Sequence, residues 1–164
     1  MTDRQCTAET IATHNNITLK RIERNSYGKD FDRDTYTCEV RDALIDHEID
    51  LIAMAGFGTI LNKPIYDDFS NRILNTHPSL LPSFPGWHAV EEALEYGVKV
   101  TGCTVHIATE EVDAGPILAQ ESIPVLKDDT KETLHERIKT VERQLYVDTI
   151  NKIITTNGQI ERDQ

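Results

Sequence analysis

The segment Tyr36–Ala55, YTCEVRDALIDHEIDLIAMA, changes its periodicity part-way along, and this change indicates the fold class. Over Tyr36–Ile49 the apolar residues recur at helical spacing and line one face of a helix. Leu51–Ala55 is instead a continuous apolar run, which is typical of a strand covered on both faces, as in a parallel sheet. Gly56 and Gly58 then end the strand. We therefore expect a helix followed at once by a buried strand.

Further strand and helix patterns follow one another along the chain. Arg72–Asn75 reads as a short strand that runs into a proline-rich loop, and Ala89–Tyr96 reads as a short helix that Gly97 ends. Val98–Ala108 and Gly115–Ile123 are expected to be paired strands around a turn. This alternation predicts an α/β domain with a mostly parallel sheet. In open sheets of this type the ligand crevice lies beyond the carboxyl ends of the strands.

Two more elements are expected toward the ends of the chain. Ile17–Ile22 alternates well enough for a strand. A long helix begins near Asp129, which can cap it, and Glu132 three residues later supports the cap. The apolar stripe of this helix has roughly helical spacing and consists of Leu134, Ile138, Val141, Leu145, Ile150 and Ile153. We expect a single domain over residues 1–157 and a frayed tail over 158–164.

Composition excludes several classes of protein. The chain has 28 acidic and 17 basic residues, and a net charge of -11 argues against binding to nucleic acid, because neutralisation of phosphates supplies most of that affinity. No apolar run approaches the ~18 residues that a membrane span needs. The N-terminus has no apolar signal core, and three widely spaced cysteines suit a reducing compartment and give no metal framework. We expect a cytoplasmic protein that binds neither membrane nor metal.

Three polar residues form the main candidate for chemistry. Asn75 and His77 are two residues apart on an extended segment, so both side chains point to one face. An amide and an imidazole side by side can hold a carbonyl oxygen as it becomes an oxyanion. Asp113 lies in a Gly- and Pro-containing turn that can aim its carboxylate, and near His77 it would favour the charged ring and accept a proton. The alternative is a polar strand end and an Asp bonded to its own turn. Spacing alone favours the polar strand end, and it cannot place Asp113 beside His77.

Other motifs are weaker. His106, between Val105 and Ile107, reads as a packed and hydrogen-bonded strand residue. No HExxH, P-loop or GxGxxG pattern occurs, and Ser79 and Ser83 lack the context of a serine nucleophile.

Four segments together resemble a known family. The segments Asn75–Ala89 (NTHPSLLPSFPGWHA), Thr101–Ala108 (TGCTVHIA), Val112–Pro116 (VDAGP) and Thr140–Tyr146 (TVERQLY) closely resemble the phosphoribosylglycinamide formyltransferases, a folate-dependent family of purine biosynthesis. The resemblance implies a Rossmann-like formyltransferase fold. It also implies transfer of a formyl group from 10-formyltetrahydrofolate, as co-substrate, to the amine of glycinamide ribonucleotide, without a metal. By resemblance, Asn75 and His77 stabilise the oxyanion, and Asp113 supports the charged His77 and helps to move the amine proton.

The resemblance also implies the binding residues. Those expected to line the folate cleft are Arg33, Phe57, Gly58, Thr59, Ile60, Leu61, Glu110, Glu111, Val112 and Asp113. Glu142, together with Asn75, is expected to contact glycinamide ribonucleotide. The ordinary alternatives are a surface residue near a helix start for Arg33 and a solvated helix charge for Glu142. Where the family usually has Met-Arg, this chain has Gly58-Thr59, and Ala114 replaces a frequent glycine.

The largest departure is at the N-terminus. The family's first strand and its glycine-rich phosphate loop have no counterpart, so the fold is expected to be N-terminally truncated. An incomplete sheet would favour a homodimer or a partner chain at the exposed edge. Two other functions stay open: a folate-dependent formyltransferase or hydrolase that uses a different acceptor, and a non-catalytic remnant that binds folate.

Overall fold

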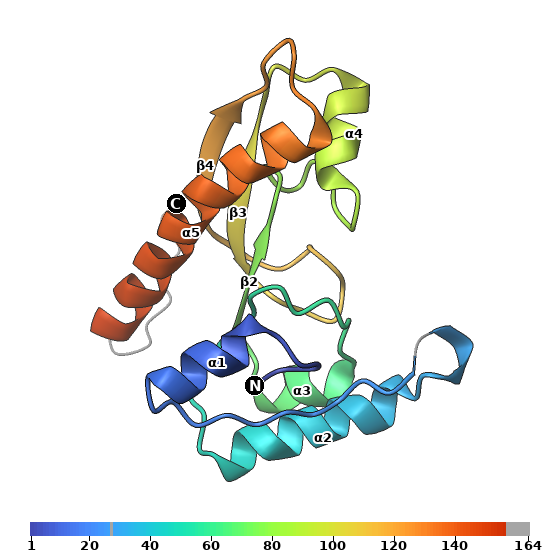
Figure 1. The fold of residues 1–164 in the computed structure, drawn as a ribbon, viewed down its shortest axis with the longest axis vertical. Helices are drawn as coiled ribbons and strands as arrows, with labels where there is room; N and C mark the ends of the chain where they lie inside the picture. Colours follow the sequence, from blue (N-terminus) through green and yellow to red (C-terminus); the bar gives the residue numbers. More distant parts are fainter. Residues whose placement is uncertain (27, 157–164) are drawn as a thin grey trace. The chain divides into compact units, whose positions relative to one another are not determined.

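The computed structural model describes residues 1–26 and 28–156, which group into two compact units (Figure 1). Among the described residues, the first unit comprises 1–26, 28–51 and 56–70, and the second comprises Ile52–Ala55 and residues 71–156. Each unit is described by itself. The predicted single domain over 1–157 stays a prediction, and the tail over 158–164 lies outside the described residues.

The first unit contains short helices. They are α1 (Thr7–His14), the 3-10 helix η1 (Gly28–Asp30), α2 (Arg33–Asp46) and α3 (Lys63–Asp68). The side chain of Asp32 accepts a hydrogen bond from the Thr35 backbone N–H at 3.0 Å, so α2 begins before the predicted Tyr36. α2 packs against α3 and buries Tyr36 and Val40. The predicted helix is therefore confirmed, with its bounds shifted toward the N-terminus.

The strand predicted at Ile17–Ile22 is wrong. Only an isolated bridge between Thr2 and Arg21 forms there within the described residues, and the side chains of Ile17 and Leu19 are exposed. A strand needs a partner that continues the ladder. The chain near Thr2 supplies one bridging residue, so an alternating pattern alone did not make a strand.

In its described part, the second unit is a four-stranded sheet with two helices. Its strands are β1 (Ile52–Ala53), β2 (Ile73–His77), β3 (Val100–Ile107) and β4 (Ile117–Pro124), in the order β1-β2-β3-β4. β1 pairs with β2 in parallel, whereas β2–β3 and β3–β4 are antiparallel. The α/β class is confirmed, and the expectation of a mostly parallel sheet is refined to a mixed sheet.

β1 is shorter and less covered than its sequence predicts. It has two residues, of which Ile52 is half-buried and Ala53 is exposed, so the apolar run Leu51–Ala55 is not covered on both faces. The helix α5 (Lys131–Thr155) holds this edge, because the Tyr146 hydroxyl lies 3.0 Å from the carbonyl oxygen of Met54 and 2.9 Å from that of Leu74.

The helices of this unit follow their predicted patterns. α4 (Ala89–Tyr96) ends at Gly97, which has a left-handed φ of 79°. α5 packs along β3 and β4, and the core between them contains Val90, Cys103, Ile123, Leu134 and Ile138 (Figure 1). The predicted cap of α5 is wrong by one residue.

Thr130 is the N-cap of α5, and it forms a capping box with Thr133 instead of Glu132. Asp129 instead accepts a hydrogen bond from the Leu126 backbone N–H and forms an ion pair with Arg137. These two contacts use Oδ2, and Oδ1 accepts from the Arg137 guanidinium and the Thr133 hydroxyl, so both carboxylate oxygens are engaged outside the helix backbone.

Candidate active site

The pairing of β2 with β3 brings polar side chains onto one face of the sheet. Asn75 lies opposite His106, and His77 lies opposite Thr104. Residues two apart on a strand share a face, so these four side chains point to the same side. The expectation that Asn75 and His77 share a face is confirmed by this register.

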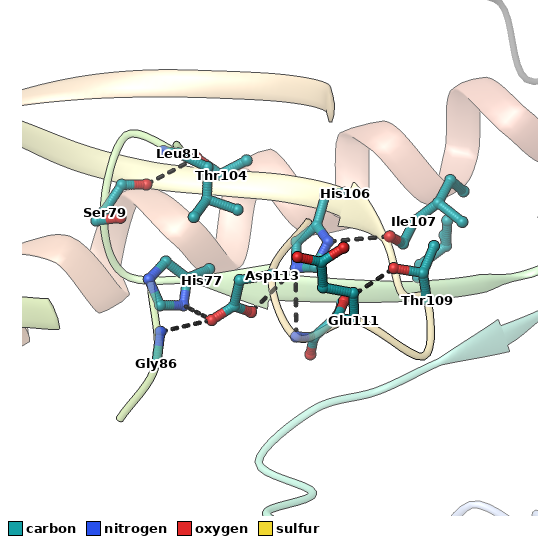
Figure 2. Close-up of polar contacts among 12 residues, drawn as sticks. His77, Ser79, Leu81, Gly86, Thr104, His106, Ile107, Thr109, Glu111 and Asp113 are labelled. Atoms are coloured by element: carbon teal, nitrogen blue, oxygen red, sulfur yellow. Dashed lines mark hydrogen bonds and ion pairs between the residues drawn. The ribbon is translucent and has the colours of Figure 1, made fainter. Parts of the chain in front are cut away.

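Asp113 reaches this face from the turn between β3 and β4. Its backbone has a φ of 56°, a left-handed conformation that is uncommon outside glycine. The Asp113 carboxylate lies 3.2 Å from Nδ1 of His77 and accepts a hydrogen bond of 2.8 Å from the backbone N–H of Gly86 (Figure 2). The structure therefore places the aspartate beside the histidine, which spacing could not establish.

The two ring nitrogens of His77 both face oxygen atoms. Nδ1 faces Asp113, and Nε2 lies 2.7 Å from the backbone carbonyl oxygen of Phe84. The side chains are 5% exposed for His77 and 7% exposed for Asp113, so little water competes for these contacts. A carbonyl and a carboxylate only accept hydrogen bonds, so a ring with a proton on each nitrogen satisfies both contacts.

The loop that follows His77 is fixed by side chains of its own sheet. The Thr104 hydroxyl donates to the Ser79 carbonyl oxygen at 2.7 Å and accepts from the Leu81 backbone N–H at 3.1 Å. The Ser79 hydroxyl in turn donates to the Ser83 carbonyl oxygen. Thr104 and Ser79 are fully buried, so these hydrogen bonds are shielded from water and hold the loop in place.

His106 belongs to this cluster, although the sequence indicated only a packed strand residue. Its Nδ1 lies 3.0 Å from the carbonyl oxygen of Ile107. Its Nε2 lies 3.4 Å from Nδ2 of Asn75 and 3.6 Å from Oδ1 of Asp113. Burial lowers the pKa of His106, which favours the neutral ring. The signal available in the sequence was its two-residue spacing from Thr104, but its register against Asn75 is a long-range property.

Glu142 lies on α5, behind the strand that carries Asn75 and His77. Its half-buried carboxyl group is hydrogen-bonded to the side chain of Thr76, the residue between the two. Burial raises the pKa of Glu142, while Thr76 and the nearby His77 act in the opposite direction. The ordinary reading of Glu142 as a solvated helix charge is therefore wrong, and its contact with a substrate stays a prediction.

The residues predicted for the folate cleft lie in both compact units. Arg33 is exposed at the start of α2, and Phe57–Leu61 follows in the same unit. Thr59 is buried there, and its hydroxyl accepts a hydrogen bond of 3.1 Å from Arg24. Glu110, Glu111 and Val112 are exposed on the turn that carries Asp113 in the other unit. Their shared role stays a prediction.

The arrangement can stabilise negative charge and accept a proton. Asn75 supplies a donor, Nε2 of His77 supplies a second one when it leaves the Phe84 carbonyl oxygen, and Asp113 supplies a carboxylate that is held by a ring and a backbone N–H. Among residues 1–26 and 28–156, no group of three or more His, Cys, Asp or Glu side chains is placed to hold a metal ion. In the same part of the chain, no helix has the length and apolar character to cross a membrane.

Comparison with known proteins identifies the family. A family model described as formyl transferase matches residues 2–150. The chain belongs to the formyl transferase family. The resemblance drawn from Asn75–Ala89 and the turn Val112–Pro116 is thereby confirmed, and the protein is an enzyme that transfers a one-carbon group. The family implies a donor derived from folate.

Individual members of the formyl transferase family that are similar to this chain carry more specific names. The chain is 45% identical over 153 residues to phosphoribosylglycinamide formyltransferase of Mycobacterium tuberculosis. These 153 residues make up 93% of this chain and 70% of the relative. The crystal structure of glycinamide ribonucleotide transformylase 1 from Symbiobacterium toebii matches with a TM-score of 0.83 and 39% identity, over 90% of this chain and 69% of that one. A formyltetrahydrofolate deformylase from Pseudomonas syringae matches with a TM-score of 0.77 and 27% identity, over 87% of this chain and 46% of that one.

Proposed function

We propose that the chain transfers the formyl group of 10-formyltetrahydrofolate to the amine of glycinamide ribonucleotide, a step of purine biosynthesis. The observation that carries this proposal is the buried contact of 3.2 Å between Nδ1 of His77 and the Asp113 carboxylate, on the same face as Asn75. Relatives named for this activity at 45% identity support the choice of acceptor.

In the proposed reaction, the amine nitrogen attacks the formyl carbon and the carbonyl oxygen becomes an oxyanion. Asn75 donates a hydrogen bond to this oxygen, and His77 donates a second one from Nε2, which must first leave the Phe84 carbonyl oxygen. These hydrogen bonds lower the barrier because the charge develops only in the transition state. Asp113 holds the His77 ring and takes part in removing the amine proton. The bond between the formyl carbon and N10 then breaks, and N10 gains a proton. Alignment of amine and formyl group supplies much of the remaining acceleration.

A direct test follows the reaction with purified protein. The chain is incubated with both substrates, while loss of 10-formyltetrahydrofolate and formation of formylated product are measured. We expect turnover that His77→Ala reduces by about 100-fold or more. His88→Ala is the matched control, because the His88 side chain is 73% exposed and pairs with Glu91. Absence of turnover, or equal rates for His77→Ala and the parent chain, would overturn the proposal.

The deformylase among the structural relatives favours one alternative, a hydrolase that passes the formyl group to water. Omitting glycinamide ribonucleotide separates the two reactions, because a hydrolase releases formate without any acceptor. We expect formate release without acceptor to be slow compared with transfer. Tight binding of folate without either reaction would instead support a non-catalytic protein.

A further inference from the structure

His106 is the most buried titratable side chain of the cluster, with 1% of its side chain exposed. Its Nδ1 faces the carbonyl oxygen of Ile107 at 3.0 Å, and a carbonyl oxygen can only accept a hydrogen bond. Nδ1 therefore carries a proton. The state of the ring then depends on Nε2, which has two polar neighbours.

These two neighbours favour opposite protonation states of Nε2. Nδ2 of Asn75, at 3.4 Å, is a donor and requires a lone pair on Nε2, whereas Oδ1 of Asp113, at 3.6 Å, would accept a proton from it. Burial has the largest effect on the pKa of His106 and lowers it, and the His77 ring lowers it too. The Ile107 carbonyl oxygen and the Asp113 carboxylate raise the pKa by smaller amounts. The neutral ring with a proton on Nδ1 therefore fits the site, and it leaves Nε2 as an acceptor.

A neutral His106 fixes the orientation of the Asn75 amide. If the amide were rotated by half a turn, its oxygen would face the lone pair of Nε2, and two acceptors would then oppose each other. With the NH2 group toward the ring, one N–H of Asn75 is held by Nε2 and the second stays available as a donor.

We propose that His106 is a positioning residue, which holds the Asn75 carboxamide with its NH2 group as the donor side for the reacting oxygen. The proposal rests on the proposed formyl transfer and deepens it. His106 acts through Asn75 and does not touch the reacting atoms. The competing role is a charged His106 that shares a proton with Asp113, and the experiment separates the two.

The first arm of the test measures the protonation state of the His106 ring directly and does not require enzymatic activity. Protein labelled with 15N at histidine is examined by NMR near neutral pH. We expect His106 to be neutral, with its proton on Nδ1 and none on Nε2. A proton on Nε2, in a neutral or a charged ring, would overturn the proposal. If the parent chain shows no turnover, the proposed function fails while this arm still decides the state of His106.

The second arm is a double-mutant cycle on turnover. We expect His106→Leu, which removes the acceptor at similar size, to lower kcat about tenfold with KM for both substrates within about twofold. His106→Gln, which restores an acceptor, should recover part of that loss. Combined with Asn75→Ala, His106→Leu should cost no more than about twofold further, because the residue it positions is already gone.

The matched control for the cycle is Val105→Ala, a buried neighbour on the same strand. A merely structural effect of Val105 should multiply with that of Asn75→Ala, since independent sites add in free energy. If the effects of His106→Leu and Asn75→Ala multiply in the same way, His106 does not act through Asn75. Where His106→Leu fails to fold, the NMR measurement on the parent chain still decides the proposal, because it shows whether Nε2 is an acceptor.

Discussion

Gly115 approaches Ile107 so closely that a Cβ atom on the glycine would lie 1.8 Å from the Ile107 carbonyl oxygen. That oxygen is also the partner of His106 Nδ1, and the Ile107 backbone N–H donates to Pro116 at 2.9 Å. The turn that carries Asp113 is therefore packed directly on the end of β3. The absence of a side chain at Gly115 allows this packing, which in turn lets the Asp113 carboxylate reach His77.

We expect Gly115→Ala to destabilise the chain by about 3 kcal/mol or more, because backbone atoms cannot move away from the added methyl group without breaking their hydrogen bonds. Urea denaturation measures the loss. Ala114→Ser, at the exposed neighbouring position, should stay within about 0.5 kcal/mol of the parent chain. Equal stability of Gly115→Ala and the parent would show that the turn is not packed as described.

Asp113→Asn tests the charge of the carboxylate while its shape is kept. The amide oxygen can still accept from the Gly86 N–H, but it carries no negative charge to support the His77 ring. We expect kcat to fall by about 100- to 10,000-fold, with a smaller change in KM. Steady-state kinetics measure both, and retention of at least half of the parent kcat would contradict a role in proton transfer.

Glu142→Gln should change how stability depends on pH. Burial raises the pKa of Glu142 in the folded chain above its ordinary value of 4.5, so the folded state binds this proton more tightly than the unfolded state. The resulting stabilisation is present below 4.5 and is lost as pH rises through the raised folded pKa. The variant should therefore gain stability over the parent as pH increases.

Urea denaturation of both proteins from about pH 4 to about pH 8 checks this sign. If the stability of the variant relative to the parent stays constant or falls with rising pH, the prediction is contradicted. If Glu142 also contacts the acceptor substrate, the same variant should raise KM for glycinamide ribonucleotide while KM for the folate stays unchanged.

Tyr146→Phe removes the hydroxyl that joins α5 to the carbonyl oxygens of Met54 and Leu74. We expect a loss of about 1 kcal/mol in the free energy of unfolding, the usual contribution of one hydrogen bond. Tyr96→Phe is the control, because Tyr96 is 81% exposed and should change stability by less than about 0.5 kcal/mol. Similar losses for the two variants would assign no special role to the Tyr146 hydroxyl.

Local patterns predicted the elements whose stability is local. The bounds of α4 and its end at Gly97 match the sequence expectation, since a left-handed glycine acts within one helical turn. The paired strands β3 and β4 were also expected, because one turn joins them. Ile17–Ile22 and Leu51–Ala55 were less predictable, since a strand depends on a partner elsewhere in the chain.

The same distinction applies to the site. The shared face of Asn75 and His77 follows from the two-residue period of one strand. The proximity of Asp113 to His77 depends on the packing of a turn against a strand, and family resemblance had to supply it. The contact between His106 and Asn75 depends on cross-strand register, which no local pattern encodes. The sequence therefore predicts only a packed and hydrogen-bonded strand residue at His106.

The Asp113 carboxylate contacts both ends of the loop after His77, because it lies beside the His77 ring and accepts a hydrogen bond from the Gly86 backbone N–H. The exchange of the Gly86 amide hydrogen with solvent deuterium is therefore a built-in probe of that carboxylate. Any event that draws Asp113 away, such as proton uptake or arrival of a reactant, should release this amide and make its exchange faster. The Gly86 amide thus reports on the Asp113 carboxylate in a measurement that needs no turnover.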